Sequence, residues 1–523
     1  MRTEQFSGDI LLLNGDIRVS PPWDVSVPAL LIQDGIVTAH GEAALARQEE
    51  FPDHNIIDLK QRTVLPGFTD SHLHLSMLGE RLSQLDFPEN SAREDIQSQV
   101  ADAARNSAPG KWIIGGKWSR HALGGFPDKS LLDEVAPENP VALYSKDLHS
   151  VLINSVALTQ ARITAETADP PGGKIVRNDQ NEPTGVLQED AMDLFERARP
   201  EKGINDFRKE HGLAANHCHQ YGITSVHSIE NWKNFTRYQQ MLEDGQLQIR
   251  AGCLIYKDDL DAIIDAGLRS SQGDEWLWLI GVKAFADGAL GSRTAWMKQP
   301  YESTDDRGMP LLSRDDLVNL RRRCHSHELS TGIHAIGDAA VDLCLDIFTG
   351  GENGLQDRIE HLQLIDEGDL DKISSHISAA VQPVHLLGDR NPADTWWGER
   401  AQYAYAFRTL LDRGANLAFG SDAPVEDVNP WLSVQAAVER RSAPDEQQWY
   451  PQECISVNAA ITAFTSGSAH LGYRGQQMGT IRIGALGDAV VLNRNPWKVA
   501  PTELQTIQPD MTIVNGVRVY SNG

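Results

Sequence analysis

The chain has 523 residues, of which 41% are hydrophobic and 23% are charged, proportions typical of a globular protein with a large buried core. It contains 47 lysines and arginines against 73 aspartates and glutamates, which gives a formal net charge of −26. A field of that sign repels phosphate backbones and anionic membrane surfaces, so we expect no nucleic-acid partner and no membrane partner.

The cysteine content and the N-terminus indicate the compartment. Five cysteines without a CxxC pair argue against a disulfide framework and against a structural zinc site built on cysteine. The first residues lack the basic-then-apolar layout of a signal peptide, and no apolar run is long enough to span a membrane. We therefore expect a soluble, cytoplasmic protein that acts on a small molecule.

Both ends of the chain consist of short apolar runs separated by turn sequences. Ile10–Asn14 and Ala29–Ile32 represent this pattern near the start, and Met511–Val514 and Val517–Tyr520 flank an Asn-Gly turn near the end. Residues 1–62 and 475–523 therefore predict one small β-sandwich built from both termini.

The middle of the chain, residues 63–474, alternates between short apolar strands and helical stretches. This alternation predicts a parallel sheet, and eight units favour a closed (β/α)8 TIM-like barrel. The expected strands are Thr63–Phe68, Val141–Tyr144, Ile223–Val226, Leu279–Phe285, Ser330–His334, Arg358–Leu364, Ala379–Val384 and Asn416–Gly420. Long gaps predict insertions at about 78–140 and about 155–215, which would lie over the barrel mouth and bear on specificity. Tryptophans such as Trp118 in these insertions either line an apolar pocket or pack the insertion, as a lid, onto the barrel.

Two histidines at the end of the first expected strand suggest a metal site. His72 and His74 are two residues apart, and on a strand such residues face the same side, so both imidazoles can bind one ion. The same spacing recurs at His217 and His219 and again at 325 and 327, but these pairs lie in helical stretches, where the side chains diverge.

Further ligand types occur at the ends of later expected strands, where barrel active sites form. His334, His361 and Asp422 supply nitrogen and carboxylate donors, which borderline divalent metals favour together. Lys283 ends another strand. A protonated lysine cannot bind metal, so Lys283 either carries a carbamate derived from CO2 or forms an ordinary ion pair.

These motifs together resemble the metal-dependent amidohydrolase superfamily, in particular its amidohydrolase family 3 branch, which includes N-substituted formamide deformylase-like proteins. The stretches that carry the resemblance are Leu65–His74, Lys283–Ala295, Phe419–Val425 and Gly484–Leu492. The resemblance covers nearly the whole chain and does not identify the substrate.

The resemblance implies a binuclear site at the barrel mouth. His72, His74 and Asp422 would bind the more buried ion, and His334 and His361 would bind the more exposed one. The metal would be zinc, although manganese, iron, cobalt and nickel also suit these donors. The resemblance also implies a homodimer.

Carboxylated Lys283 would bridge the two ions, although superfamily members with one metal and no bridging lysine also exist. His149 and His227, expected at the ends of the second and third strands, would reach substrate or serve as ordinary polar residues. Arg293 would bind a carboxylate or oxyanion, or fix its own loop through an ion pair.

The predicted reaction is hydrolysis of a C–N bond in an amide, N-formyl compound or cyclic amide. A metal-activated hydroxide would attack the carbonyl carbon, and Asp422 would accept the proton and pass it to the leaving amine. A metal-dependent lyase or isomerase on the same scaffold is the alternative, followed by a non-catalytic scaffold that has lost its metal.

Overall fold

A computed structural model describes residues 8–88, 91–146, 149–348 and 354–522. The chain divides into two compact units. The larger unit comprises Met1–Gly79 and His211–Gly523, and the smaller unit comprises Glu80–Glu210. Among the described residues, no helix combines the length and the apolar character that crossing a bilayer requires.

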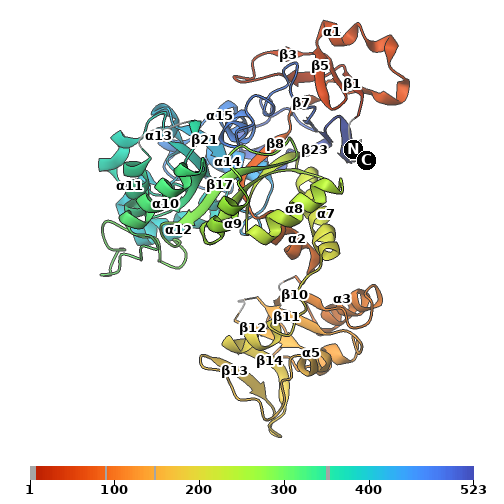
Figure 1. Cartoon of the computed structure of the whole chain (residues 1–523), viewed down its shortest axis with the longest axis vertical. Coiled ribbons are helices and arrows are strands. Elements are labelled where there is room, and N and C mark those ends of the chain that lie inside the picture. Colours follow the sequence, from red (N-terminus) through yellow and green to blue (C-terminus); the bar gives the residue numbers. More distant parts are fainter. Residues whose placement is uncertain (1–7, 89–90, 147–148, 349–353, 523) are drawn as a thin grey trace. The chain divides into compact units, whose positions relative to one another are not determined.

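Two sheets of the larger unit are built from the chain termini, as the sequence predicts. One has the order β5 (Ile36–His40), β4 (Leu30–Gln33), β1 (Ile10–Leu13) and β6 (Ile56–Asp58). The other has the order β24 (Val517–Ser521), β23 (Pro509–Val514), β22 (Ala489–Leu492), β7 (Thr63–Pro66), β2 (Asp16–Arg18) and β3 (Ser26–Val27). Figure 1 shows the red N-terminal and blue C-terminal strands beside each other. Buried side chains from both ends, including Leu12, Leu30, Val491 and Ile513, form one core between the sheets.

The rest of the larger unit is an eight-stranded parallel barrel, which confirms the predicted fold class. Its strands in order are β8 (Phe68–Leu73), β15 (Ile223–Glu230), β16 (Arg250–Tyr256), β17 (Leu277–Phe285), β18 (Ser330–Ala335), β19 (Arg358–His361), β20 (Ser378–Val381) and β21 (Asn416–Phe419). Two backbone hydrogen bonds close the ring: Asp422 N–H donates to His72 O at 2.7 Å, and His74 N–H donates to Ala423 O at 2.8 Å. Barrel closure therefore brings the first and last strands together at the residues expected to bind metal.

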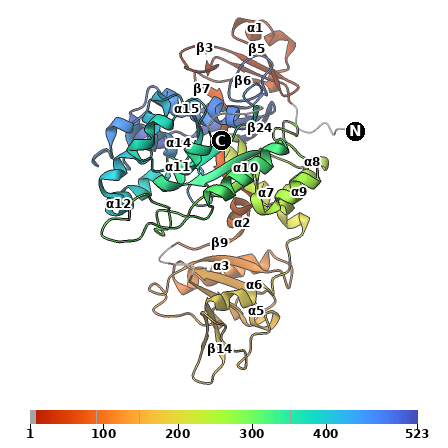
Figure 2. The ribbon, with the colours of Figure 1, turned by 60° about the vertical axis from the view of Figure 1, so that its left-hand side comes forward.

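Helices surround this barrel. They are α2 (Leu75–Ser83), α7 (Ile204–Gln220), α8 (Trp232–Glu243), α9 (Leu260–Asp265), α10 (Arg314–Ser326), α11 (Asp338–Ile347), α12 (His385–Trp397), α13 (Phe407–Asp412), α14 (Pro430–Glu439), α15 (Val457–Thr462) and α16 (Ser468–Leu471). Figure 2 shows α10, α11 and α14 on the outside of the strands. A buried pair, Arg250 Nε to Asp488 Oδ2 at 2.7 Å, ties β16 to the terminal sheets.

Two of the expected barrel strands require correction. Thr63–Phe68 is not one strand: β7 pairs with β22 in a terminal sheet, and the barrel begins at Phe68. The chain changes sheets at Gly67, where a Cβ atom would lie 2.2 Å from Thr224 Oγ1. Val141–Tyr144 is not a barrel strand, and the third barrel strand, Arg250–Tyr256, was not predicted from the sequence.

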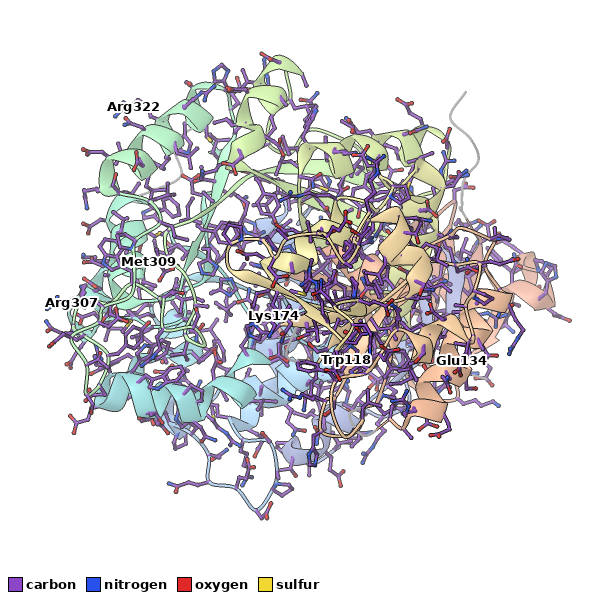
Figure 3. All side chains as sticks on the ribbon, turned by 90° about the horizontal axis from the view of Figure 1, so that it is seen from below. Trp118, Glu134, Lys174, Arg307, Met309 and Arg322 are labelled. Atoms are coloured by element: carbon purple, nitrogen blue, oxygen red, sulfur yellow. The ribbon has the colours of Figure 1, made fainter. Side chains whose placement is uncertain are left out.

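The smaller unit contains the Val141 strand within a mixed six-stranded sheet. The order is β13 (Gly173–Arg177), β14 (Pro183–Glu189), β12 (Ser150–Ile153), β11 (Val141–Ser145), β10 (Ile113–Trp118) and β9 (Leu85–Asp86). Helices α3 (Arg93–Arg105) and α4 (Ser130–Asp133) pack on one face, and α5 (Ser155–Gln160) and α6 (Asp193–Glu196) on the other. The two insertions expected from the sequence thus form one α/β unit with the strand between them. Trp118, labelled in Figure 3, is buried in its core and donates to Leu143 O at 2.6 Å.

Candidate metal centre

The carboxyl ends of the barrel strands surround a cavity of about 310 Å³ that contains the candidate ligands. Six predicted residues line it: His72, His74, Lys283, His334, His361 and Asp422. They come from β8 and the residue that follows it, from β17, β18 and β19, and from the turn after β21, because parallel strands of a barrel all end at the same rim.

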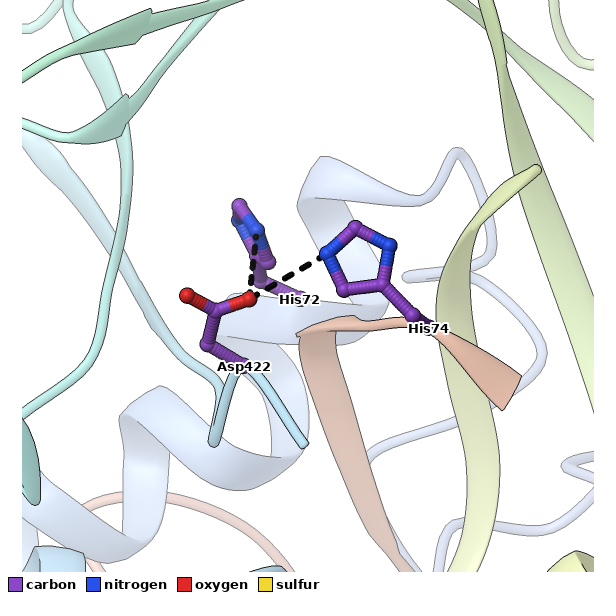
Figure 4. A group of neighbouring side chains, drawn as sticks. All are labelled: His72, His74 and Asp422. Carbon is purple, nitrogen blue, oxygen red and sulfur yellow. Dashed lines mark ion pairs between the residues drawn. The ribbon is translucent and has the colours of Figure 1, made fainter. Parts of the chain in front are cut away.

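Asp422 occupies the centre of this arrangement. Its Oδ1 lies 3.4 Å from His72 Nε2 and 3.3 Å from His74 Nε2, and Figure 4 shows both rings directed at that oxygen. The other oxygen, Oδ2, lies 3.4 Å from His385 Nε2. Two candidate ligand groups therefore share one carboxylate: His72, His74 and Asp422, and His361, His385 and Asp422. The donor atoms of each group lie within 4.8 Å of one another.

The sequence reasoning missed His385, the first residue of α12. It follows β20 directly in Gln382-Pro383-Val384-His385, so the strand-end rule that selected the other ligands would also have found it. Helix α12 begins at this residue, and the imidazole therefore projects from the first turn beside the ends of the strands.

A second row of buried residues orients His72. Its Nδ1 lies 2.6 Å from Glu360 Oε2, and because an ionised carboxylate only accepts, Nδ1 carries the proton and Nε2 faces Asp422. Arg358 in turn holds Glu360, with Nε 2.6 Å from Oε1. A carboxylate behind a ligating histidine fixes its tautomer and raises its basicity, so this pair suits a metal ligand. Burial alone would raise the pKa of Glu360, but Arg358 and His72 hold that pKa well below its usual range.

Asp70 joins the two strands that carry these ligands. Its buried carboxylate accepts from His72 N at 3.0 Å and from Ser421 N at 3.1 Å. Gly420 permits the close approach, because a Cβ atom there would lie 2.5 Å from His72 N. The local sequence thus fixes the backbone on both sides of Asp422, whose own φ of 62° is left-handed.

The charges in the cavity favour a bound cation. Burial alone would raise the pKa of Asp422, but His72, His385 and His74 outweigh it and hold that pKa well below the usual range. Burial also opposes protonation of His72, yet the carboxylates of Glu360 and Asp422 raise its pKa overall. The two carboxylates thus attract positive charge to this position, and a metal ion bound there would supply it directly.

His334 and His361 are neutral in this setting, as metal ligands must be. Burial, reinforced by Lys283, lowers the pKa of His334 to about 3, and burial with the neighbouring His334 lowers that of His361 well below its usual value. Their ring centres are 4.5 Å apart. His334 Nε2 lies 2.9 Å from the carbonyl oxygen of Gly288, so Nε2 is the donor and Nδ1 is left with the lone pair.

Lys283 is buried in the cavity wall, and its Nζ has no hydrogen-bond partner among the described residues. Burial lowers the pKa of Lys283 to about 8, against the opposing attraction of Glu360 and Asp422. An amine with such a pKa is partly neutral near pH 7, which is the form that reacts with CO2.

The three expected substrate-binding residues have different surroundings. His149 belongs to the smaller unit, where its Nδ1 lies 3.0 Å from Glu189 Oε1. His227 does not end a strand, since β15 continues to Glu230; it is fully buried, and its Nδ1 accepts from Arg358 at 3.0 Å. Arg293 is exposed and has a φ of 56°, and its guanidinium carbon lies 5.8 Å from the ring centre of Trp396. Neither His227 nor Arg293 lines the cavity.

Comparisons with known proteins show what the chain is similar to. The profile of a family described as "Amidohydrolase family" matches residues 55–520. The chain is 34% identical to Protein LONG AFTER FAR-RED 3 of Arabidopsis thaliana, over 94% of this chain and 88% of that protein. It is 26% identical to N-substituted formamide deformylase of Arthrobacter pascens, over 98% of both chains. Among solved structures, an uncharacterized metal-dependent hydrolase from Pyrococcus furiosus matches with a TM-score of 0.78 and 28% identity, over 94% of this chain and 100% of that one.

Proposed function

We propose that this chain, which belongs to the amidohydrolase family, hydrolyses a C–N bond in a small amide, N-formyl compound or cyclic amide with the help of bound metal. The observation that best supports this proposal is the single carboxylate of Asp422 shared by two groups of histidines at the barrel rim. The relative named N-substituted formamide deformylase makes formamides the first compounds to test.

The residues present fit a borderline divalent metal such as zinc. Neutral imidazoles and an ionised carboxylate are the donors such metals bind, and Glu360 supplies the outer carboxylate that ligating histidines usually have. When bound, the metal would polarise the substrate carbonyl and lower the pKa of a coordinated water towards about 7.

The chain's own residues would manage the protons. Asp422 is ionised at neutral pH because its pKa lies well below the usual range, so it can accept the proton of the attacking water. It then delivers that proton to the leaving nitrogen as the C–N bond breaks, and an acid and an amine leave the site.

We also propose that Lys283 carries a carbamate when two ions bind. The neutral Nζ forms a bond to the carbon of CO2 and releases one proton, which converts a neutral amine into an anionic carbamate. The resulting carboxylate would lie in the wall of the cavity that both histidine groups line. Without the carbamate, the site would hold one ion, and Asp422 would be the one carboxylate that both histidine groups share.

N-benzylformamide provides a direct test with zinc-loaded protein. We expect formate and benzylamine in equal amounts, activity that a chelator removes, and a fall of roughly 10²–10⁴-fold in kcat for Asp422→Asn. Asp258→Asn, at a side chain that is 82% exposed, is the matched control and should leave kcat unchanged.

Oxygen-18 water separates the alternatives. Hydrolysis places one labelled oxygen atom in the acid product, whereas a lyase or isomerase turns substrate over without incorporating label. Failure of the protein to retain any metal would contradict the proposal and favour the non-catalytic scaffold.

A further inference from the structure

The wall of the cavity beside His385 carries two polar side chains that the proposed chemistry does not use, Asp389 and Gln363. Asp389 lies one helical turn after His385 on α12, so the two side chains project from the same helix face. Gln363 follows β19 and is buried. Both residues therefore face the space where a substrate would contact the candidate ligands.

Hydrogen bonds hold Asp389 in a fixed orientation. Its Oδ2 accepts from Gln363 Nε2 at 2.9 Å and from the Tyr405 hydroxyl at 2.6 Å. Burial, reinforced by the charge of Asp389, raises the pKa of Tyr405 well above its usual value, so Tyr405 remains a donor. Both donors bind the same oxygen.

This arrangement leaves two acceptor atoms on residues that line the cavity. Asp389 Oδ1 has no hydrogen-bond partner among the described residues. The Gln363 amide donates to a carboxylate, which fixes its nitrogen and leaves its oxygen as the other free acceptor. No lysine or arginine pairs with Asp389 in the described part of the chain. A free carboxylate oxygen and a free amide oxygen together match a group that carries several N–H donors.

The surrounding charge has the same sign. Burial, together with the nearby charge of Asp389, raises the pKa of Glu426, although His385 opposes the shift. The carboxylates of Asp389 and Glu426 thus lie close enough to repel each other, and a cationic ligand group bound at Asp389 would relieve that repulsion. The remaining lining residues near the candidate ligands include apolar side chains, among them Phe285, Leu290, Ile336 and Val425, which suit a hydrocarbon body.

We propose that Asp389 and Gln363 form a specificity subsite that binds a positively charged nitrogen group of the substrate, an ammonium or amidinium. This inference rests on the proposed function and narrows its substrate class to amides that carry such a group on a short apolar body. Asp389 is then a substrate-binding residue, and Tyr405 positions it.

Calorimetry on zinc-loaded protein tests the subsite without turnover. The probes are benzylammonium, neutral benzyl alcohol and anionic benzoate, which share one ring. We expect benzylammonium to bind roughly tenfold to a hundredfold more tightly than benzyl alcohol, as a charge-assisted hydrogen bond would provide. Asp389→Asn should remove that preference and leave the Kd of benzyl alcohol within about twofold, because the amide keeps the shape and loses the charge.

Two further variants sharpen the result. Gln363→Leu removes the second acceptor and should weaken benzylammonium binding by a smaller factor than Asp389→Asn does. Asp258→Asn, exposed on the surface, should change nothing. Equal binding of the cation and the alcohol, binding of neither, or a cation preference that survives in Asp389→Asn would each overturn the subsite.

A turnover arm separates this inference from the proposed function. N-[3-(aminomethyl)benzyl]formamide and the neutral N-(3-ethylbenzyl)formamide differ only in the charged group. Hydrolysis of both with equal kcat/KM supports the proposed function and contradicts the subsite. A calorimetric preference for the cation without hydrolysis of either compound supports the subsite and contradicts the proposed function.

Discussion

Replacing Lys283 by methionine is the most informative single change in the metal centre. Methionine is close to lysine in size and is apolar, and Nζ of Lys283 has no hydrogen-bond partner among the described residues, so the substitution breaks no such bond. The variant also removes an amine from a fully buried position, so we expect it to fold at least as well as the wild type.

The expected magnitude follows from the pKa of Lys283. At its ordinary value of 10.5, about 0.03% of the amine would be neutral at pH 7; at about 8, roughly 9% is neutral, an increase of about 300-fold. Because only the neutral amine reacts with CO2, carbamate formation and loading of a second ion should rise as the pH increases from 6 towards 9. The lowered pKa of Lys283 thus makes carboxylation of its amine accessible near neutral pH.

Elemental analysis after incubation with zinc and bicarbonate measures the outcome. We expect about two ions per wild-type chain and about one per Lys283→Met chain, and only the wild type should gain the mass of one CO2 in native mass spectrometry. Lys257→Met, at a partly exposed lysine, is the matched control. Two ions in Lys283→Met, or one ion in the wild type with or without bicarbonate, would refute the bridging carbamate.

Three other changes probe the same centre. Glu360→Gln should weaken zinc affinity by about 10–100-fold in a chelator competition, because His72 loses its outer carboxylate; unchanged affinity would contradict that role. Gly420→Ala should cost about 1–3 kcal/mol in denaturant unfolding, since its Cβ would lie 2.5 Å from His72 N, whereas Gly203→Ala, with nothing within 4 Å, should be tolerated. Free zinc at a hundredfold excess over its Kd should stabilise the folded chain by about 2.7 kcal/mol, so removing zinc should lower Tm. A Tm that does not change with chelator would argue against the site.

The barrel was predictable because its strands are apolar runs with polar residues at one end. The error at Val141–Tyr144 has a clear cause: a buried strand of the smaller sheet has the same composition as a barrel strand, and only its pairing partners distinguish them. Arg250–Tyr256 was missed, and its first residue is held by Asp488, which lies 238 positions away. Long-range pairing of this kind leaves no local trace in the sequence.

The candidate ligands were predictable to the extent that they end strands. Residues that act through other residues were not, because their role depends on contacts between strands. Glu360 lies beside His361 in the sequence, yet its partner is His72, on a strand 288 positions away. The expected place of His149 at the end of a barrel strand was wrong, since the strand before it belongs to the smaller unit rather than to the barrel.

The backbone of the metal centre departs from regular geometry where its ligands lie. His361 and Asp422 have φ values of 68° and 62°, and Leu362 has 43°. Non-glycine residues in this region cost free energy, which the surrounding structure must supply. Asp70 and the closing hydrogen bonds of the barrel supply it around Asp422, where they fix Ser421 and His72 on either side. Strain of this kind at two candidate ligands, together with the unpaired amine of Lys283, indicates that this rim is shaped to hold ligands at the expense of stability. A variant that relaxes it, such as Asp422→Gly, should therefore gain backbone stability while losing metal.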